Sequence, residues 1–192
     1  MKKFELTNEF ITNMFGTKLF RIRALVEFGD VEAGELGGYV EKESNLGHDD
    51  NAWVYDNAWV YGDAQVSGDA LVYDNARVYG NARVYGDAQV SGDARVCGNA
   101  RVYGDARVCG NGDYAYAHGF GSVNRTTTFF RLKDGGVGVR CGCFYGTLAQ
   151  FRDKIRETHG ESAIAEEYLD LAALMEKRFR RTGNEQKTEE ES

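Results

Sequence analysis

The middle of the chain is an uninterrupted tandem repeat of six residues. From Asn51 to Gly110 the sequence reads NAWVYD, NAWVYG, DAQVSG, DALVYD, NARVYG, NARVYG, DAQVSG, DARVCG, NARVYG, DARVCG, which is ten hexads without a gap. Position one is always Asn or Asp, position two is always Ala, and position four is always Val. Such short units must stack on one another, because a single hexad cannot bury a core of its own.

Each hexad predicts a short strand followed by a corner. The residues Ala-x-Val-Tyr alternate, so Ala and Val share one face and the other two side chains share the opposite face. The corner residues, Gly or Asp followed by Asn or Asp, tolerate the left-handed backbone of tight turns. The chain contains no Pro, which keeps every strand N–H available to the neighbouring coil. The repeat therefore predicts a parallel β-helix with Ala and Val inside.

The repeat block resembles the hexapeptide-repeat family, whose members fold as left-handed parallel β-helices with three hexads per coil. The left hand is taken from this resemblance, since general crossover rules favour the opposite hand. Eighteen residues per coil give about 3.3 coils for ten hexads, and a prism about 16 Å long. Members of the family are commonly trimers, so the resemblance also implies a homotrimer.

At eighteen residues per coil, the outward side chains stack into three faces. The first face is the least charged, and it carries Trp53 and Tyr55, then Leu71 and Tyr73. We interpret these residues, with Trp59 of the second face, as a candidate interface with another copy. Packing of the terminal segments on the same surface is the alternative.

The second and third faces interleave Arg with Tyr. Rows of Arg flanked by aromatic rings can hold phosphates and stack on bases. A solvated surface is the opposing interpretation, supported by five Arg against seven Asp in the repeat block. The candidate ligand-binding residues are Arg77, Tyr79, Arg83, Tyr85, Arg95, Arg101 and Tyr103.

The segment before the repeats has a different character. Strands are expected at residues 4–8 and 18–26 around a turn at Gly16, and Gly37 with Gly38 predicts a second tight turn. We expect this hairpin to cap the first coil. The stretch GELGGYVEKESNL, leading into the hexads, resembles a group of phage and prophage proteins. That resemblance implies a viral or prophage source and a fixed cap, and it implies no particular activity.

After the last hexad, residues 111–125 predict an irregular coil and a linker. Residues 126–133 and 137–145 predict two strands joined by an Asp-Gly-Gly turn. Helices are expected from Thr147 to near Gly160 and over 162–181. The apolar stripe of the second helix is Ile164, Tyr168, Leu171, Leu174 and Met175.

The fold class expected from these elements is mainly β: a left-handed parallel β-helix with an N-terminal hairpin cap and a small C-terminal α+β (ββαα) domain. The stretch CGCFYGTLAQFRDKIRETHG resembles a small domain that recurs at the ends of phage proteins, which implies interaction or assembly. The expected parts are the cap at 1–50, the β-helix at 51–118, the ββαα domain at 119–182 and a disordered tail at 183–192.

The cysteines carry little sign of metal or disulfide chemistry. Cys141 and Cys143 form C-x-C on one predicted strand, and two ligands fall short of a metal site, which favours burial against the helices. Cys97 and Cys109 fall on different faces, so they should not pair. The sequence also lacks a phosphate-cradling glycine loop between a strand and a helix. We expect neither a metal nor a cofactor.

His118 is the one weak catalytic candidate. Hexapeptide acyltransferases typically depend on a His, and the hexads of this chain contain none. His118 follows the repeats and could act as a general base near a subunit cleft. A structural or surface role is the alternative, as it is for His48 and for His159 at a helix end. The sequence leaves catalysis open and leans against it.

Composition narrows the functional classes further. The 192 residues carry a net charge of −7, which disfavours binding to duplex nucleic acid by bulk charge. No apolar run approaches the roughly 20 residues of a membrane helix. The start of the chain has no apolar signal core, which with four scattered Cys predicts a cytoplasmic protein.

We therefore expect a non-catalytic, phage-type binding or scaffold protein in the host cytoplasm. Its partner would be a host protein or a nucleotide-type signal held at subunit clefts, as in counter-defence. The alternatives are an acyltransferase that uses His118 and a structural component of the virion or its assembly.

Overall fold

The computed structural model describes residues 2–190 of the chain, and the side chains of residues 2–182. The chain divides into two compact units, Met1–Asn111 and Gly112–Ser192. We describe each unit separately. None of the described helices is long and apolar enough to cross a membrane.

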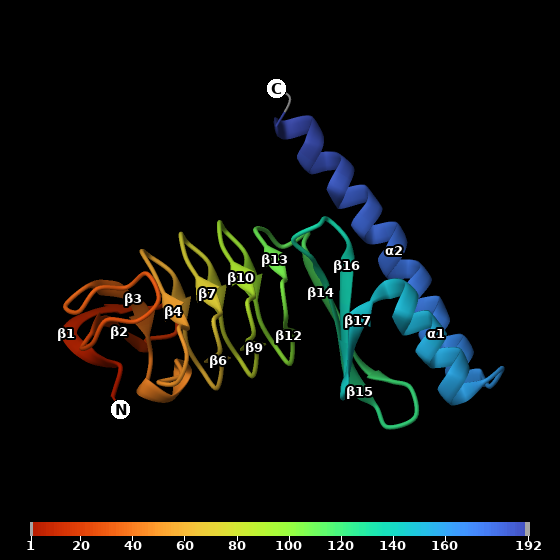
Figure 1. Ribbon diagram of the computed structural model, residues 1–192, viewed down its shortest axis with the longest axis horizontal. Coiled ribbons are helices and arrows are strands. Elements are labelled where there is room, and N and C mark those ends of the chain that lie inside the picture. Colours follow the sequence, from red (N-terminus) through yellow and green to blue (C-terminus); the bar gives the residue numbers. More distant parts are fainter. Residues whose placement is uncertain (1, 191–192) are drawn as a thin grey trace. The chain divides into compact units, whose positions relative to one another are not determined.

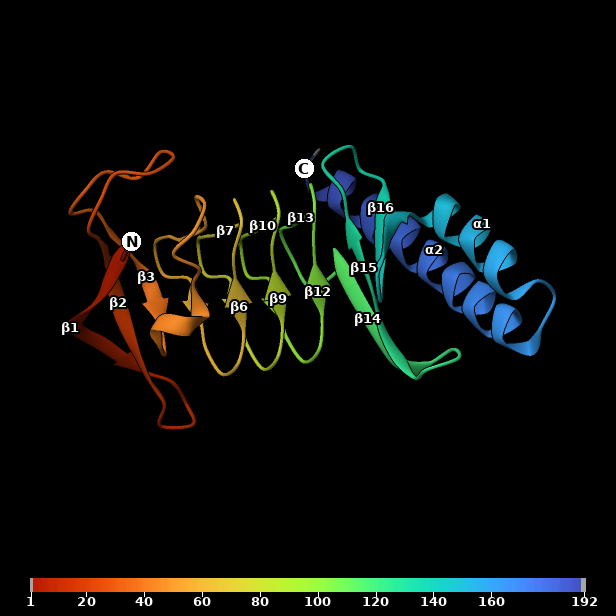
Figure 2. The same cartoon turned by 60° about the horizontal axis from the view of Figure 1, so that its bottom comes forward.

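The first unit contains a β-solenoid whose coils stack side by side (Figures 1 and 2). Each hexad supplies one two-residue strand, and strands 18 residues apart pair in parallel, as Trp53 does with Leu71. The first face holds β4 (Trp53–Val54), β7 (Leu71–Val72), β10 (Gln89–Val90) and β13 (Arg107–Val108). The second holds β5 (Trp59–Val60), β8 (Arg77–Val78) and β11 (Arg95–Val96), and the third holds β6 (Gln65–Val66), β9 (Arg83–Val84) and β12 (Arg101–Val102). The predicted repeat architecture and its three faces are confirmed.

The solenoid interior is built from the two invariant apolar positions of the hexad. Every Ala at position two and every Val at position four from Ala52 to Val108 is at most 1% exposed. The sixth position turns each corner with a left-handed backbone, as at Gly62 (φ 70°) and Asp74 (φ 58°). Gly and Asp occupy it because few other residues adopt that conformation at low cost.

The N-terminal segment adds strands to the second face. β1 (Phe4–Thr12) and β2 (Lys18–Ala24) form the expected antiparallel hairpin, with Gly16 at φ 81° in its turn. β3 (Leu36–Val40) pairs antiparallel with β2 and in parallel with β5, at a spacing of 20 residues rather than 18. A short 3-10 helix, η1 (Glu43–Asn45), follows, and the bridge between Leu46 and Val66 continues the pairing on the third face.

Gly37 and Gly38 have a role that differs from the expected turn. Both lie buried inside β3. A Cβ atom on Gly37 would lie 2.5 Å from the carbonyl oxygen of Val54, and one on Gly38 would lie 2.7 Å from that of Ala58. These glycines are therefore needed because β3 approaches the first coil too closely for any side chain.

The second unit is a four-stranded antiparallel sheet with two helices. Its strands are β14 (Tyr114–Phe120), β15 (Arg125–Arg131), β16 (Val137–Cys141) and β17 (Phe144–Thr147), paired in that order. The expected linker at 111–125 is therefore wrong, because β14 pairs with β15 along its length. The expected boundary at residue 118 moves to Asn111 for the same reason. The second predicted strand is two strands, broken at Gly142, whose φ is 59°.

The helices α1 (Leu148–His159) and α2 (Ala163–Glu190) pack on one face of this sheet (Figure 2). Thr147 caps α1 as predicted: its hydroxyl accepts from the Gln150 N–H at 3.3 Å, and the Gln150 side chain accepts from the Thr147 N–H at 2.8 Å. The buried core combines sheet and helix residues, namely Phe129, Val139, Cys141, Leu148, Phe151, Ile155, Ala165, Tyr168, Leu171, Ala172, Met175 and Phe179.

Two details of α2 differ from the expected pattern. Ile164 and Leu174 belong to the predicted apolar stripe, yet they are 36% and 59% exposed, because Ala165 and Ala172 turn inward instead. The helix also continues past its predicted end near residue 181. The predicted disordered tail at 183–192 is therefore wrong over 183–190, which α2 includes, and residues 191–192 lie outside the described part of the chain.

Candidate functional site

The second face aligns arginine and aromatic side chains on neighbouring coils. Arg77 and Arg95 lie in register on β8 and β11. The guanidinium of Arg77 lies 4.1 Å from the centre of the Trp59 ring on the preceding coil. Tyr61 and Tyr79 stack with ring centres 5.0 Å apart and an interplanar angle of 4°. The face thus presents a row of cations beside a row of flat rings.

The third face repeats the arrangement on different coils. Arg83 and Arg101 lie in register on β9 and β12. Tyr85 and Tyr103 have ring centres 4.5 Å apart and an interplanar angle of 40°. All seven predicted ligand-binding residues therefore lie in two rows per face, as the hexad spacing requires.

The arginine rows bring like charges close together on successive coils. Successive coils lie about 4.8 Å apart, so in-register arginines hold like charges close together, which costs free energy unless an anion or carboxylate compensates. The phenols beside them stay neutral, because burial raises the pKa of Tyr61 and of Tyr79 above the ordinary value. Neutral rings next to cations can stack on a flat ligand while the arginines hold its charge.

The first face differs from the interface that the sequence predicted. Trp53 is 0% exposed, because Phe4 and Phe28 from the N-terminal segment pack edge-on against its ring. Trp53 is therefore covered by a terminal segment, as the alternative interpretation predicted. The prediction that Trp53 lies in an interface with another copy is wrong. Tyr55, Leu71 and Tyr73 are half-buried, as is Trp59 on the second face, and they remain candidates for contact with another copy.

The four cysteines are free thiols in different surroundings. Cys141 is buried at the end of β16, whereas Cys143 is exposed beyond the break at Gly142. The prediction that both cysteines lie on one strand is therefore wrong, since the break separates them, and the predicted burial holds for Cys141 and not for Cys143. Within the part of the chain that is described, no three His, Cys, Asp or Glu side chains gather as metal ligands do.

The histidines lie outside the solenoid coils. His118 is exposed on β14 of the second unit, and its Nδ1 lies 2.8 Å from the Thr126 hydroxyl on β15. His48 is held at the N-terminal end of the repeats: its Nδ1 accepts from the Lys3 N–H at 3.2 Å, and its ring stacks on Phe4 at 4.5 Å. His159 stacks on Tyr168 with ring centres 5.9 Å apart.

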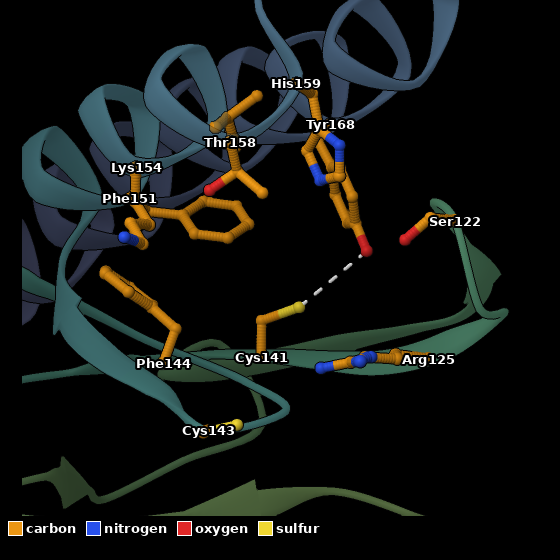
Figure 3. Close-up of a pocket in the computed structure, with 11 residues that line it drawn as sticks. Ser122, Arg125, Cys141, Cys143, Phe144, Phe151, Lys154, Thr158, His159 and Tyr168 are labelled. Carbon is orange, nitrogen blue, oxygen red and sulfur yellow. Dashed lines mark hydrogen bonds between the residues drawn. The ribbon is translucent and has the colours of Figure 1, made fainter.

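Sequence reasoning missed a second concave site, a pocket of about 450 Å³ in the second unit (Figure 3). Its residues come from β15, β16, β17, α1 and α2, which only the folded unit brings together around one cavity. Only the aromatic character of the segment around Phe144 and Phe151 gave a signal, and it equally predicts ordinary core packing.

A comparison with protein families supports the repeat architecture. The family model described as the YdcK beta-solenoid repeat matches residues 64–78, 76–92 and 94–110. These matches lie within the hexads and cover less than half of the chain. Among curated proteins, none matches the sequence.

Proposed function

We propose that the protein is a non-catalytic binding protein of phage or prophage type that acts in the host cytoplasm. Its solenoid is left-handed, is capped by residues 1–50, and serves as the scaffold of a homotrimer. The ligand is a nucleotide-type signal that the trimer sequesters at subunit clefts, which would serve counter-defence.

One observation carries the proposal: two solenoid faces each hold arginines in register next to a pair of neighbouring tyrosine rings, stacked on the second face and tilted by 40° on the third. Arginine recognises phosphate oxygens through paired N–H donors, and aromatic rings stack on nucleobases without regard to sequence. A ligand with two phosphates spaced like successive coils would match the spacing of neighbouring arginines in a row. The net negative charge of the chain disfavours the binding of long nucleic acids and is compatible with the binding of a small nucleotide.

The trimer rests on the resemblance to hexapeptide-repeat proteins and on the half-buried residues that remain on the flanks of the solenoid. Leu71 and Tyr73 belong to the least charged face, and a partner would complete their burial. In a trimer, each cleft between subunits would repeat three times and could combine rows from two copies.

Native mass spectrometry of gently purified protein tests the assembly and the ligand together. We expect a trimer that carries a few hundred daltons of added mass per site. A monomer would overturn the trimer and its clefts. A trimer without added mass would shift the proposal from a small ligand to a host protein partner.

Calorimetry with adenosine monophosphate and a linear diadenylate tests the arginine rows directly. The double variant Arg83→Ala, Arg101→Ala should weaken binding at least about tenfold, because two charge-assisted contacts are lost. The matched control Arg156→Ala, Arg180→Ala removes the same charge from exposed helix positions of the second unit and should bind normally. Equal binding by the two double variants would refute the role of the rows.

A further inference from the structure

The pocket of the second unit has an aromatic, apolar wall. The rings of Phe144 and Phe151 lie with their centres 5.4 Å apart and are tilted by 43° to each other, and Ile155 continues the wall one turn along α1. The Tyr168 ring closes the far side, at 5.9 Å and nearly perpendicular to the Phe151 ring. In Figure 3 these rings surround an open space rather than filling it. A planar apolar group is the shape that such a wall accommodates.

The opposite end of the pocket carries a guanidinium. Arg125 begins β15, and its side chain lies against the turn at Gly142, where a Cβ atom would collide with Nη1. Among the residues whose side chains are described, none with a carboxylate forms an ion pair with Arg125. Figure 3 shows Ser122 and the Tyr168 hydroxyl on the same side of the pocket as Arg125.

The charge of the lining is positive. Of the described residues that line the pocket, none is acidic, whereas Arg125, Lys154 and His159 are basic. Lys154 is already paired with Glu157 at 2.9 Å, outside the pocket. The nearby Glu167 carboxylate accepts the Gly121 N–H at 2.6 Å and so fastens the β14–β15 turn to α2. Arg125 is therefore the cation of the lining that is available to bind a ligand.

A chain of hydrogen bonds ends at the Tyr168 hydroxyl in the lining of the pocket. The Thr127 hydroxyl donates to Cys141 Sγ at 3.2 Å, and the Cys141 thiol donates to the Tyr168 oxygen at 4.0 Å. Burial raises the pKa of Tyr168 to about 12, so this phenol keeps its proton at neutral pH. Because its oxygen already accepts from the thiol, the phenolic proton is directed to another acceptor. Tyr168 is 5% exposed, so few water molecules compete for that proton.

We propose that this pocket binds a small aromatic carboxylate. The carboxylate would lie between the Arg125 guanidinium and the Tyr168 phenol, and the ring would lie against Phe144 and Phe151. Arginine and a carboxylate match in geometry through two parallel N–H donors. A single unpaired arginine balances one negative charge, which favours a carboxylate over a phosphate dianion. A volume of about 450 Å³ lies within the range of small-molecule sites.

Calorimetry with 2-naphthoate and its neutral analogue 2-naphthamide tests the site in the full-length protein. We expect the carboxylate to bind at least about tenfold more tightly than the amide. Arg125→Gln should abolish that preference, because carboxylate binding loses much more than amide binding does. The matched control Lys133→Gln removes an exposed positive charge outside the pocket and should keep the preference. Thr158→Trp, at an exposed rim position on α1, should block both probes.

Several results would overturn the proposal. Equal affinity for the two probes, no saturable binding of either, or an unchanged preference in the Arg125→Gln protein would each do so. Tighter binding of phenyl phosphate than of 2-naphthoate would replace the carboxylate by a phosphate. Near-ultraviolet circular dichroism of each variant shows whether it keeps the native packing. The site belongs to the second unit and shares no residue with the arginine rows, so its test is independent of the nucleotide proposal.

Discussion

Lys3 shows how a single charged residue is stabilised at the start of the repeat block. Its side chain is buried, and Nζ donates to the carbonyl oxygens of Asp50 at 3.1 Å and Ala52 at 2.8 Å. It also lies 4.5 Å from the centre of the Phe28 ring. Burial lowers the pKa of Lys3 to about 8, and the nearby carboxylates, Asp50 first among them, offset this only in part. Lys3 thus donates hydrogen bonds to two backbone carbonyls, and the free-energy cost of burying its charge depends on pH.

The pH dependence of stability follows from that lowered pKa. Between about pH 8 and about pH 10.5 the unfolded chain binds more protons at Lys3 than the folded chain, so stability should rise with pH across this window. Lys3→Met should remove this rise, and should lower stability at neutral pH by about 1–3 kcal/mol because two carbonyls lose their donor. Denaturant titrations at several pH values measure both effects. Lys18→Met, at an exposed lysine, is the control and should keep the rise; an identical pH profile for Lys3→Met would contradict the assignment.

Gly38 illustrates a residue whose importance comes from close backbone approach. A Cβ atom there would lie within 2.8 Å of the carbonyl oxygens of both Ala58 and Tyr55. Gly38→Ala should therefore displace β3 from the first coil and lower stability by at least about 2 kcal/mol, beyond ordinary overpacking. Gly110→Ala, where nothing lies within 4 Å of the added atom, should stay within about 0.5 kcal/mol of wild type. Comparable denaturation midpoints for the two variants would show that β3 has room to relax.

At the scale of elements, the hexads were predictable because their period determines which residues pair. A shift of one residue would turn every Ala and Val outward, so one strand register is possible. The C-terminal strands lack such a period. Gly142 stands inside an alternating pattern, and only its positive φ shows that the strand breaks there. The pocket depends on that break, because the break brings Arg125 and Phe144 to the same cavity. The pocket was therefore not predictable from the sequence.

The start of α1 offers a direct test at this scale. Thr147 and Gln150 satisfy two backbone N–H groups reciprocally at the first turn. Thr147→Ala should lower the stability of the second unit by about 1 kcal/mol and speed amide exchange in the first turn of α1. Gln150→Glu preserves the acceptor and is the control that should exchange normally. Unchanged exchange in the Thr147→Ala protein would mean that packing of Leu148 and Phe151 alone holds the helix end.

At the scale of the whole molecule, the division into units was predicted at the wrong residue. The segment YAYAHGF continues the alternation of the hexads, so sequence pattern assigned it to the β-helix. Its partners decide otherwise, since Tyr114 pairs with Phe130 and His118 with Thr126. This reassignment places His118 in the second unit, on a strand that pairs with β15 and not with a hexad. β14 and β15 form a hairpin joined by residues 121–124, and the alternation within β14 does not show that it pairs with β15 rather than with a hexad strand.

Stacked coils should lose their structure together, because each coil contacts only its neighbours and has no separate core. Val78 is fully buried in the middle of the second face, between Val60 and Val96. Val78→Ala should destabilise the solenoid by about 2 kcal/mol and raise amide exchange across residues 51–110 rather than in one coil. Val123→Ala makes the same change at a site that is 55% exposed and should leave exchange unaltered. Faster exchange confined to the coil of Val78 would show that the coils open one at a time. The side chains aligned on each face would then not make the coils one cooperative unit.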